Sequence, residues 1–271
     1  MIKKNVKMTE IPRYSAWRKI SLGSWKVIGD SQVYCDMNLS VKEVLPYLEK
    51  LNKENNSKIT ITHFLGKVMG KVLQEIPELN RVVTRNRIFQ REDSDIFFHI
   101  AYEKTELSGH VIRGIDNKNL DEIEGELRVN AKKVREDKDE SFKKIKRTWD
   151  FIPNSLVKVV LNLLGFISYG LNINIKALNV PQDAFGSMMI TNIGSLGFEQ
   201  AFVPLPGYTH VPIIFALGKI QWKPVCNDKG VVYSDQRVSV CVTFDHRIID
   251  GARGAKVYER LKYYFNNPEA I

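Results

Sequence analysis

Apolar residues recur at three- and four-residue steps from Ile61 to Ile76, within the stretch KITITHFLGKVMGKVLQEIPELN. This spacing places apolar side chains on one face of a helix. Thr60 or Thr62 can cap the start of this helix, and Pro77 follows its end. The pattern therefore predicts a long helix with one buried face, and it is the clearest helical signal in the chain.

Runs rich in β-branched and aromatic residues predict strands on both sides of this helix. One strand is expected within residues 27–40, and residues 41–51 then become helical. Residues 81–102 contain two such runs separated by the polar turn REDS, which predicts a hairpin, and a further strand is expected over 109–115. Residues 116–149 are rich in charge with one apolar stripe, which predicts a long, mostly solvated helix.

Residues 151–175, FIPNSLVKVVLNLLGFISYGLNINI, are almost continuously apolar and follow the basic cluster KKIKR at 143–147. A membrane span needs ~20 apolar residues with few interruptions. This stretch is interrupted by Pro153, Asn154, Lys158, Asn162 and Gly165. An amphipathic helix on an anionic membrane surface fits the basic residues beside an apolar face. A buried helix, or one covered by another subunit, is the interpretation that we prefer.

The last third alternates short strand-like runs with turns and ends in a helix through GARGAKVYERLKYYF. Strands mixed with helices along one continuous chain, without a Pro/Gly/Ser-rich linker, predict an α/β fold. The 271 residues correspond to one large or two ordinary domains. Because no convincing boundary interrupts the pattern, we expect a single domain over residues 1–271.

The composition suits a compact protein, since 44% of the residues are hydrophobic and 26% are charged. The formal net charge of +9 favours acidic partners without deciding between nucleic acid, a membrane and phosphorylated cofactors. Nucleic-acid binding is not expected, because no aromatic-rich basic groove or recognised motif accompanies the charge.

The cysteines, the histidines and the N-terminal residues indicate where in the cell the protein is expected and whether it is expected to bind a metal. Three cysteines without a Cys-x-x-Cys pair argue against a disulfide framework or a zinc ribbon. The basic start is not followed by the apolar run of a secretory signal, so a cytoplasmic location is predicted. Four of the five histidines lack metal-ligand spacing, and no metal is expected. These four are His63, His99, His110 and His210.

The densest candidate chemistry is FDHRIIDG, from Phe244 to Gly251, between a predicted strand and the final helix. A histidine in such a connection titrates near neutrality and can take a proton from a thiol or hydroxyl. The alternative is structural: His246 is an ordinary hydrogen-bonded histidine, and Asp250 caps the helix that begins near Gly251. The residues alone leave both interpretations open.

FDHRIIDGA resembles the H-x-x-x-D-G motif of the dihydrolipoyl acyltransferases of 2-oxo acid dehydrogenase complexes, which the related chloramphenicol acetyltransferases share. MMITNIGSLG, at 188–197, resembles the hydroxyl-bearing segment upstream of that motif. IPRYSAWRKIS, at 11–21, and the helix ending in PELN are similar to the opening segment and first long helix of the family. Asp245 before His246 resembles the dihydrolipoyl branch, which makes chloramphenicol an unexpected substrate.

The resemblance implies an α/β two-layer sandwich of the chloramphenicol acetyltransferase type, with a mixed sheet and helices on one face. It implies a homotrimer with each active site at a subunit boundary. His246 would be the general base that takes the proton of the attacking thiol, and Thr191 would donate to the oxyanion. Asp250 would support the site through Arg18, with Gly251 allowing close packing at the helix start. The alternatives are an ordinary strand threonine for Thr191 and a surface arginine for Arg18.

The implied activity is acyl transfer between thioesters and thiols, with a coenzyme A thioester as substrate and a dihydrolipoyl or carrier-protein arm as a candidate partner. No covalently attached lipoyl group is expected. The family blocks begin at residue 11, so we expect a free-standing catalytic domain without lipoyl or peripheral subunit-binding domains. The alternative function is a non-catalytic trimeric assembly module associated with a 2-oxo acid dehydrogenase or related complex.

The apolar residues 151–175 lie where the family has a shorter segment, which suggests an insertion. Such an insertion could cover the substrate channel, lengthen the subunit interface, or bind a long acyl chain or a membrane.

Overall fold

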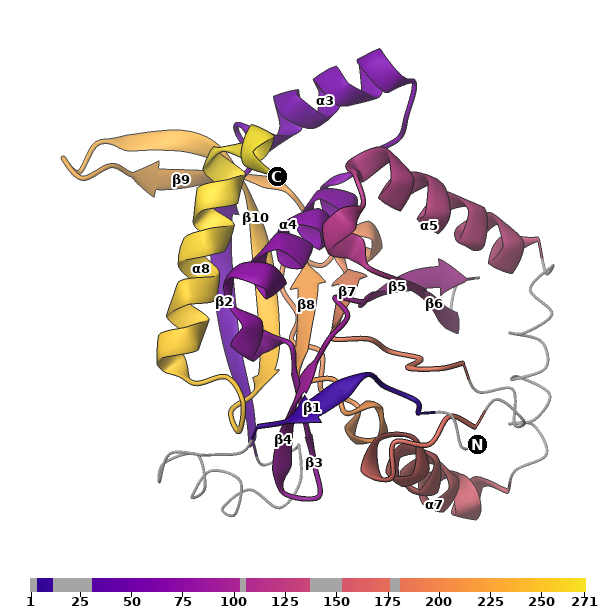
Figure 1. Ribbon diagram of the computed structural model, residues 1–271. Helices are drawn as coiled ribbons and strands as arrows, with labels where there is room; N and C mark the ends of the chain where they lie inside the picture. The colour runs from indigo at the N-terminus through magenta and orange to yellow at the C-terminus, as the bar shows by residue number, and fades with distance from the viewer. Residues whose placement is uncertain (1–3, 12–30, 103–105, 137–152, 176–180) are drawn as a thin grey trace.

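The structure is a computed structural model that describes residues 4–11, 31–102, 106–136, 153–175 and 181–271. Its centre is a seven-stranded mixed sheet with the order β2-β10-β8-β7-β5-β6, in which β9 also pairs with β10 (Figure 1). The pairs β5–β7 and β7–β8 are parallel, and the other pairs are antiparallel. The strands are β2 (Gln32–Ser40), β5 (Ile96–Tyr102), β6 (Glu106–Ile112), β7 (Met188–Asn192), β8 (Ile213–Leu217), β9 (Gln221–Cys226) and β10 (Val232–Asp245).

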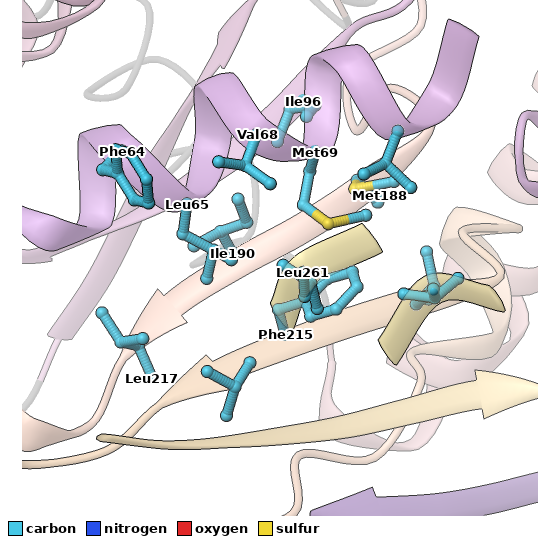
Figure 2. Packing of buried hydrophobic residues seen from close by; sticks show 14 of the residues in the cluster. Phe64, Leu65, Val68, Met69, Ile96, Met188, Ile190, Phe215, Leu217 and Leu261 are labelled. Atoms are coloured by element: carbon cyan, nitrogen blue, oxygen red, sulfur yellow. The ribbon is translucent and has the colours of Figure 1, made fainter. Parts of the chain in front are cut away.

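Helices cover one face of this sheet and enclose the main core. The helices on this side are α3 (Val44–Asn55), α4 (Ile61–Glu75), α5 (Leu120–Arg135) and α8 (Gly251–Asn266). Alternate strand residues such as Ile190 and Phe215 point toward Leu65 of α4 and Leu261 of α8 (Figure 2). The predicted two-layer α/β arrangement is therefore confirmed.

Helix α4 forms where the apolar spacing predicts it. The Nδ1 atom of His63 accepts a hydrogen bond of 2.9 Å from the backbone N–H of Thr60, which completes a capping box. The helix ends before Pro77, which begins a short 3-10 turn. On the opposite face of the sheet, Leu205 and Val211 from the loop after β7 pack on Met189 and Ile214.

The hairpin predicted across the polar turn REDS is wrong. Strand β3 (Arg81–Thr84) pairs with β4 (Arg87–Arg91), and β1 (Met8–Glu10) joins them in a separate three-stranded sheet. The turn is formed by Arg85 and Asn86, whose φ angles are +49° and +57°. Two-residue hairpin turns need this left-handed backbone. Strand β5 instead pairs with β6 and β7 in the main sheet.

The long helix predicted over 116–149 is described as α5 only as far as Arg135, and residues 137–152 lie outside the described chain. The apolar stretch that follows forms helix α7 (Asn154–Gly165) and the π-helical turn Phe166–Gly170. Gly165 packs against the backbone of Tyr208, where an added Cβ would lie 2.7 Å from the carbonyl oxygen.

The other face of α7 is apolar and exposed. Four side chains spaced three and four residues apart are each about half-exposed, namely Leu156, Val159, Leu163 and Phe166. Helix α7 is therefore not wholly buried. Cover by another subunit, by an acyl chain or by a membrane surface stays a prediction for this face.

Candidate active site

His246 lies in the turn between the end of β10 and the start of α8. Its backbone N–H donates a hydrogen bond of 2.8 Å to the carbonyl oxygen of Ser31. The residues on either side form an ion pair, in which Arg247 Nη2 lies 2.6 Å from Asp245 Oδ2 and Arg247 Nε lies 3.0 Å from both carboxylate oxygens. Asp245 is 3% exposed. The buried pair therefore fixes the backbone on both sides of His246.

Asp250 caps helix α8, as the structural alternative proposed. Its carboxylate accepts a hydrogen bond of 3.0 Å from the backbone N–H of Arg253, and Arg253 Nη1 lies 2.5 Å from the other carboxylate oxygen. Arg18 lies outside the described residues, so its pairing with Asp250 stays a prediction. Among the described residues, apart from the chain neighbours of Gly251 and the backbone of its own helix, no atom lies within 4 Å of a Cβ placed at Gly251, and close packing there stays a prediction.

Thr191 lies near the carboxyl end of β7, opposite Ala216 of β8, and is half-buried. The next residue, Asn192, ties the strand end to its surroundings: its amide donates to Thr62 Oγ1 at 2.9 Å and accepts from the backbone N–H of Ser195 at 3.0 Å. A Cβ at Gly194 would lie 2.5 Å from the carbonyl oxygen of Gly218. Gly194, two residues after Asn192, therefore allows the loop after β7 to pack closely on the backbone that follows β8.

The structure does not bring Thr191 and His246 together within one chain. Thr191 is paired with Ala216, and Ala216 is paired with Cys241 of the antiparallel strand β10. His246 follows Cys241 by five residues in the direction of β10, which runs against β7 and β8 in Figure 1. At ~3.4 Å per residue the two positions are about 17 Å apart along the strands. They therefore lie at opposite ends of the sheet.

Two residues near His246 were not identified as site residues from the sequence. Arg247 was not singled out, although the order Asp-His-Arg places opposite charges on both sides of the histidine. The His210 side chain lies within electrostatic reach of Arg247 and Asp245, and no local pattern indicated this. Burial lowers the pKa of His210, and the cations Arg247 and Arg91 lower it further. Burial, the largest cause, therefore disfavours the charged form of the ring, although the Val83 carbonyl and Asp245 act in the opposite direction.

The described ranges hold neither a candidate metal centre nor a membrane-spanning helix. No group of three or more His, Cys, Asp or Glu side chains in those ranges could hold a metal ion. Within the same ranges, none of the helices combines the length and apolar character needed to cross a bilayer.

The mixed sheet, the helices on one face and the histidine turn after β10 define an α/β fold of the chloramphenicol acetyltransferase type. A structure named chloramphenicol acetyltransferase aligns over 96% of this chain and 100% of its own, with a TM-score of 0.53 and 11% identity. The amino-acid sequence shows the family. The family model described as 2-oxoacid dehydrogenases acyltransferase (catalytic domain) matches residues 24–142 and 175–271. The chain belongs to this family.

Individual relatives agree with this assignment. The dihydrolipoyllysine-residue acetyltransferase component of the Neurospora crassa mitochondrial pyruvate dehydrogenase complex is 25% identical over 96% of this chain. The chain spans about half of that relative, 49% of its length. The dihydrolipoamide acetyltransferase of Azotobacter vinelandii aligns over 96% of this chain and 93% of its own, with 19% identity and a TM-score of 0.65. The cubic core of a pyruvate dehydrogenase multienzyme complex gives the same coverage and TM-score at 18% identity.

Proposed function

We propose that this protein is an acyltransferase that moves an acyl group between a coenzyme A thioester and the thiol of a dihydrolipoyl or carrier-protein arm. The observation that carries the proposal is the histidine turn itself, with His246 held between the buried Asp245 and Arg247 in a chain of this family. The catalytic mechanism of the Azotobacter protein has been investigated at a serine, a histidine and an asparagine four residues after the histidine. Asp250 has the same spacing from His246.

The proposed reaction begins when His246 takes the proton of the acceptor thiol. The thiolate sulfur attacks the carbonyl carbon of the acyl thioester and forms a new C–S bond, while the carbonyl oxygen takes up the negative charge. The Thr191 hydroxyl donates a hydrogen bond to this oxyanion. Collapse of the tetrahedral intermediate breaks the original C–S bond, and the departing thiolate takes the proton back from His246.

The distance between His246 and Thr191 within one chain determines how subunits combine to form the proposed active site. A base and an oxyanion donor must both lie within ~3 Å of the reacting atoms. Because Thr191 and His246 are about 17 Å apart along the strands of one chain, the active site combines His246 of one subunit with Thr191 of its neighbour. A homotrimer, in which each boundary forms one such site, satisfies this requirement by closed symmetry.

Substrate charge and cellular location complete the proposal. The net charge of +9 favours the anionic phosphates of coenzyme A or of a phosphopantetheine arm. The three cysteines, Cys35, Cys226 and Cys241, are all free, in agreement with a reducing cytoplasm.

The test is acyl exchange between a panel of acyl-coenzyme A thioesters and free dihydrolipoamide, followed by the appearance of free coenzyme A thiol. We expect transfer with a ranked preference among the acyl groups. Free acceptors are used first because they need no docking partner. A folded trimer that transfers no acyl group to dihydrolipoamide or to a carrier-bound thiol would contradict the proposal and favour the non-catalytic assembly module.

Mixed trimers give a sharper prediction about where the site is built. Chains carrying His246→Ala and chains carrying Thr191→Ala are co-expressed with different tags, and the mixed species are purified on both. In every trimer that contains both kinds of chain, one of the three boundaries combines an intact His246 with an intact Thr191, so about a third of wild-type activity is expected in the doubly purified trimers. Each variant alone serves as the control. Mixed trimers as inactive as their parents would show that both groups come from one chain.

A further inference from the structure

Residues 143–174 are not matched by the family model, which covers the chain on both sides of them. Even so, one large side chain from the described part of this segment is buried in the interior. Tyr169, in the π-helical turn after α7, is 3% exposed. Its ring stacks on the ring of His210, with a centroid distance of 5.1 Å and an interplanar angle of 28°. A segment foreign to the family pattern therefore contributes to a buried contact of the catalytic domain.

The Tyr169 ring is held in place from its hydroxyl end. The hydroxyl donates a hydrogen bond of 3.3 Å to Asp183 Oδ1, and the same carboxylate forms a buried ion pair with Arg91. Asn5 adds a further tie, because its side-chain oxygen accepts a 2.9 Å hydrogen bond from the backbone N–H of Asp183. Breaking a buried, hydrogen-bonded charge pair is expensive. The Tyr169 ring is therefore a rigid support for whatever lies against it.

His210 is equally constrained on its own side. Its Nδ1 atom lies 3.0 Å from the carbonyl oxygen of Val83, which accepts the hydrogen bond. Its backbone has a φ of +53°, a left-handed conformation that non-glycine residues rarely adopt. Surrounding structure must hold such a conformation in place. The stacked Tyr169 ring and the Val83 carbonyl both contribute to this hold.

His210 leads directly to the backbone that carries His246. Two residues later, the carbonyl oxygen of Pro212 accepts a hydrogen bond of 2.8 Å from the backbone N–H of Asp245, the residue before His246. Strand β8 begins at the next residue, Ile213, which pairs with Phe244. A displacement of His210 is therefore transmitted through one short segment and one hydrogen bond to the turn that holds His246.

We propose that Tyr169 is a positioning residue, through which the inserted segment fixes His210 and thereby the reacting position of His246. Tyr169 does not touch substrate in this role, and the inference rests on the proposed function of His246 as base. A misplacement of ~1 Å can lower a rate about 100-fold, because proton transfer needs aligned groups at hydrogen-bond distance. In this proposal, residues 143–174 contribute to the rate of acyl transfer through Tyr169. This contribution does not depend on what covers the exposed face of α7.

The test compares Tyr169→Leu, which removes the stacked ring, with Tyr169→Phe, which keeps the ring and loses only the bond to Asp183. We expect kcat to fall about 10- to 100-fold in Tyr169→Leu, with KM changed less than about twofold. The acid limb of the kcat–pH profile should also shift. Tyr169→Phe should recover most of the lost rate. Tyr233→Leu is the matched control, since that tyrosine is 48% exposed on the β9–β10 hairpin.

His210→Asn keeps the test decisive if Tyr169→Leu fails to fold. Asparagine tolerates the left-handed backbone but removes the stacked ring, so the same loss of kcat is expected. A folded Tyr169→Leu or His210→Asn protein with the kcat and pH profile of the control would overturn the inference. Equal losses in Tyr169→Phe and Tyr169→Leu would also overturn it, because the hydroxyl rather than the ring would then matter.

A failure of the proposed function is distinguishable, because wild-type protein would then transfer no acyl group. Proton NMR titration of the His246 ring, assigned with His246→Ala, provides the readout in that case. We expect Tyr169→Leu to shift the His246 titration and Tyr233→Leu to leave it unchanged. Identical titrations in both variants would reject the positional link even for an inactive protein.

Discussion

His246→Ala should lower kcat for acyl exchange about 100- to 10,000-fold, because the attacking thiol loses the base that converts it to a thiolate. KM should change little, since the imidazole acts on the reacting proton rather than on the distant parts of the substrate. The measurement is the initial rate of coenzyme A release from the preferred acyl thioester, with dihydrolipoamide as acceptor. Raising the pH should recover part of the activity, because more of the acceptor thiol is then ionised without help from the protein.

His110→Ala is the matched control for this experiment. His110 lies on β6 and pairs with Glu126 of α5 at 2.8 Å, at the opposite edge of the sheet from β10. Its loss should leave the exchange rate within about twofold of wild type, because this half-buried side chain lies away from the site. A His246→Ala protein that folds, assembles and exchanges acyl groups at the wild-type rate would remove His246 from the mechanism.

Thr191→Ala should lower kcat about 100- to 1,000-fold, which is the usual loss when one oxyanion donor is removed. The hydroxyl is expected to act mainly in the transition state, where the carbonyl oxygen becomes negatively charged, so substrate KM should be nearly unchanged. Thr191→Ser keeps the donor and should retain most of the rate. Thr191→Val has nearly the shape of threonine without the hydroxyl, and it should behave like Thr191→Ala.

This series also tests the alternative that Thr191 is an ordinary strand residue. In that case valine, which favours strands as threonine does, would preserve activity and serine would not be better than valine. The ranking serine above valine and alanine is therefore the result that assigns the role. Thermal unfolding of each variant checks that the differences in rate do not follow differences in stability.

Several features could be predicted from the sequence because they depend on neighbouring residues. The three- and four-residue spacing in α4 and the Thr60 cap describe a helix that forms from its own side chains. The alternation before His246, followed by Asp250 as a cap, likewise marks the strand, the turn and the start of α8. The placement of His246 in a strand-to-helix connection follows from these local signals.

Other features depend on contacts between segments that are far apart in the chain. The sequence pattern either did not predict these features or predicted them wrongly. The β-rich runs on both sides of REDS have no local sign that β4 turns back on β3 while β5 joins a different sheet. The stacking of Tyr169 on His210 joins two residues that lie on either side of strand β7 in the chain. Neither contact follows from periodicity, because burial against distant strands decides both.

The amino-acid sequence by itself predicted the α/β class, the main helix and the histidine turn, and its resemblance to the family supplied the candidate roles of His246, Thr191 and Asp250. Only the tertiary structure decided that Thr191 and His246 lie at opposite ends of the sheet, since strand order and register set this separation. It also decided that Tyr169, in the segment that the family model does not match, packs against His210 in the loop before β8. The physical reason is that local patterns encode which face of an element is buried, whereas the partner that buries it is chosen by the packing of the whole chain.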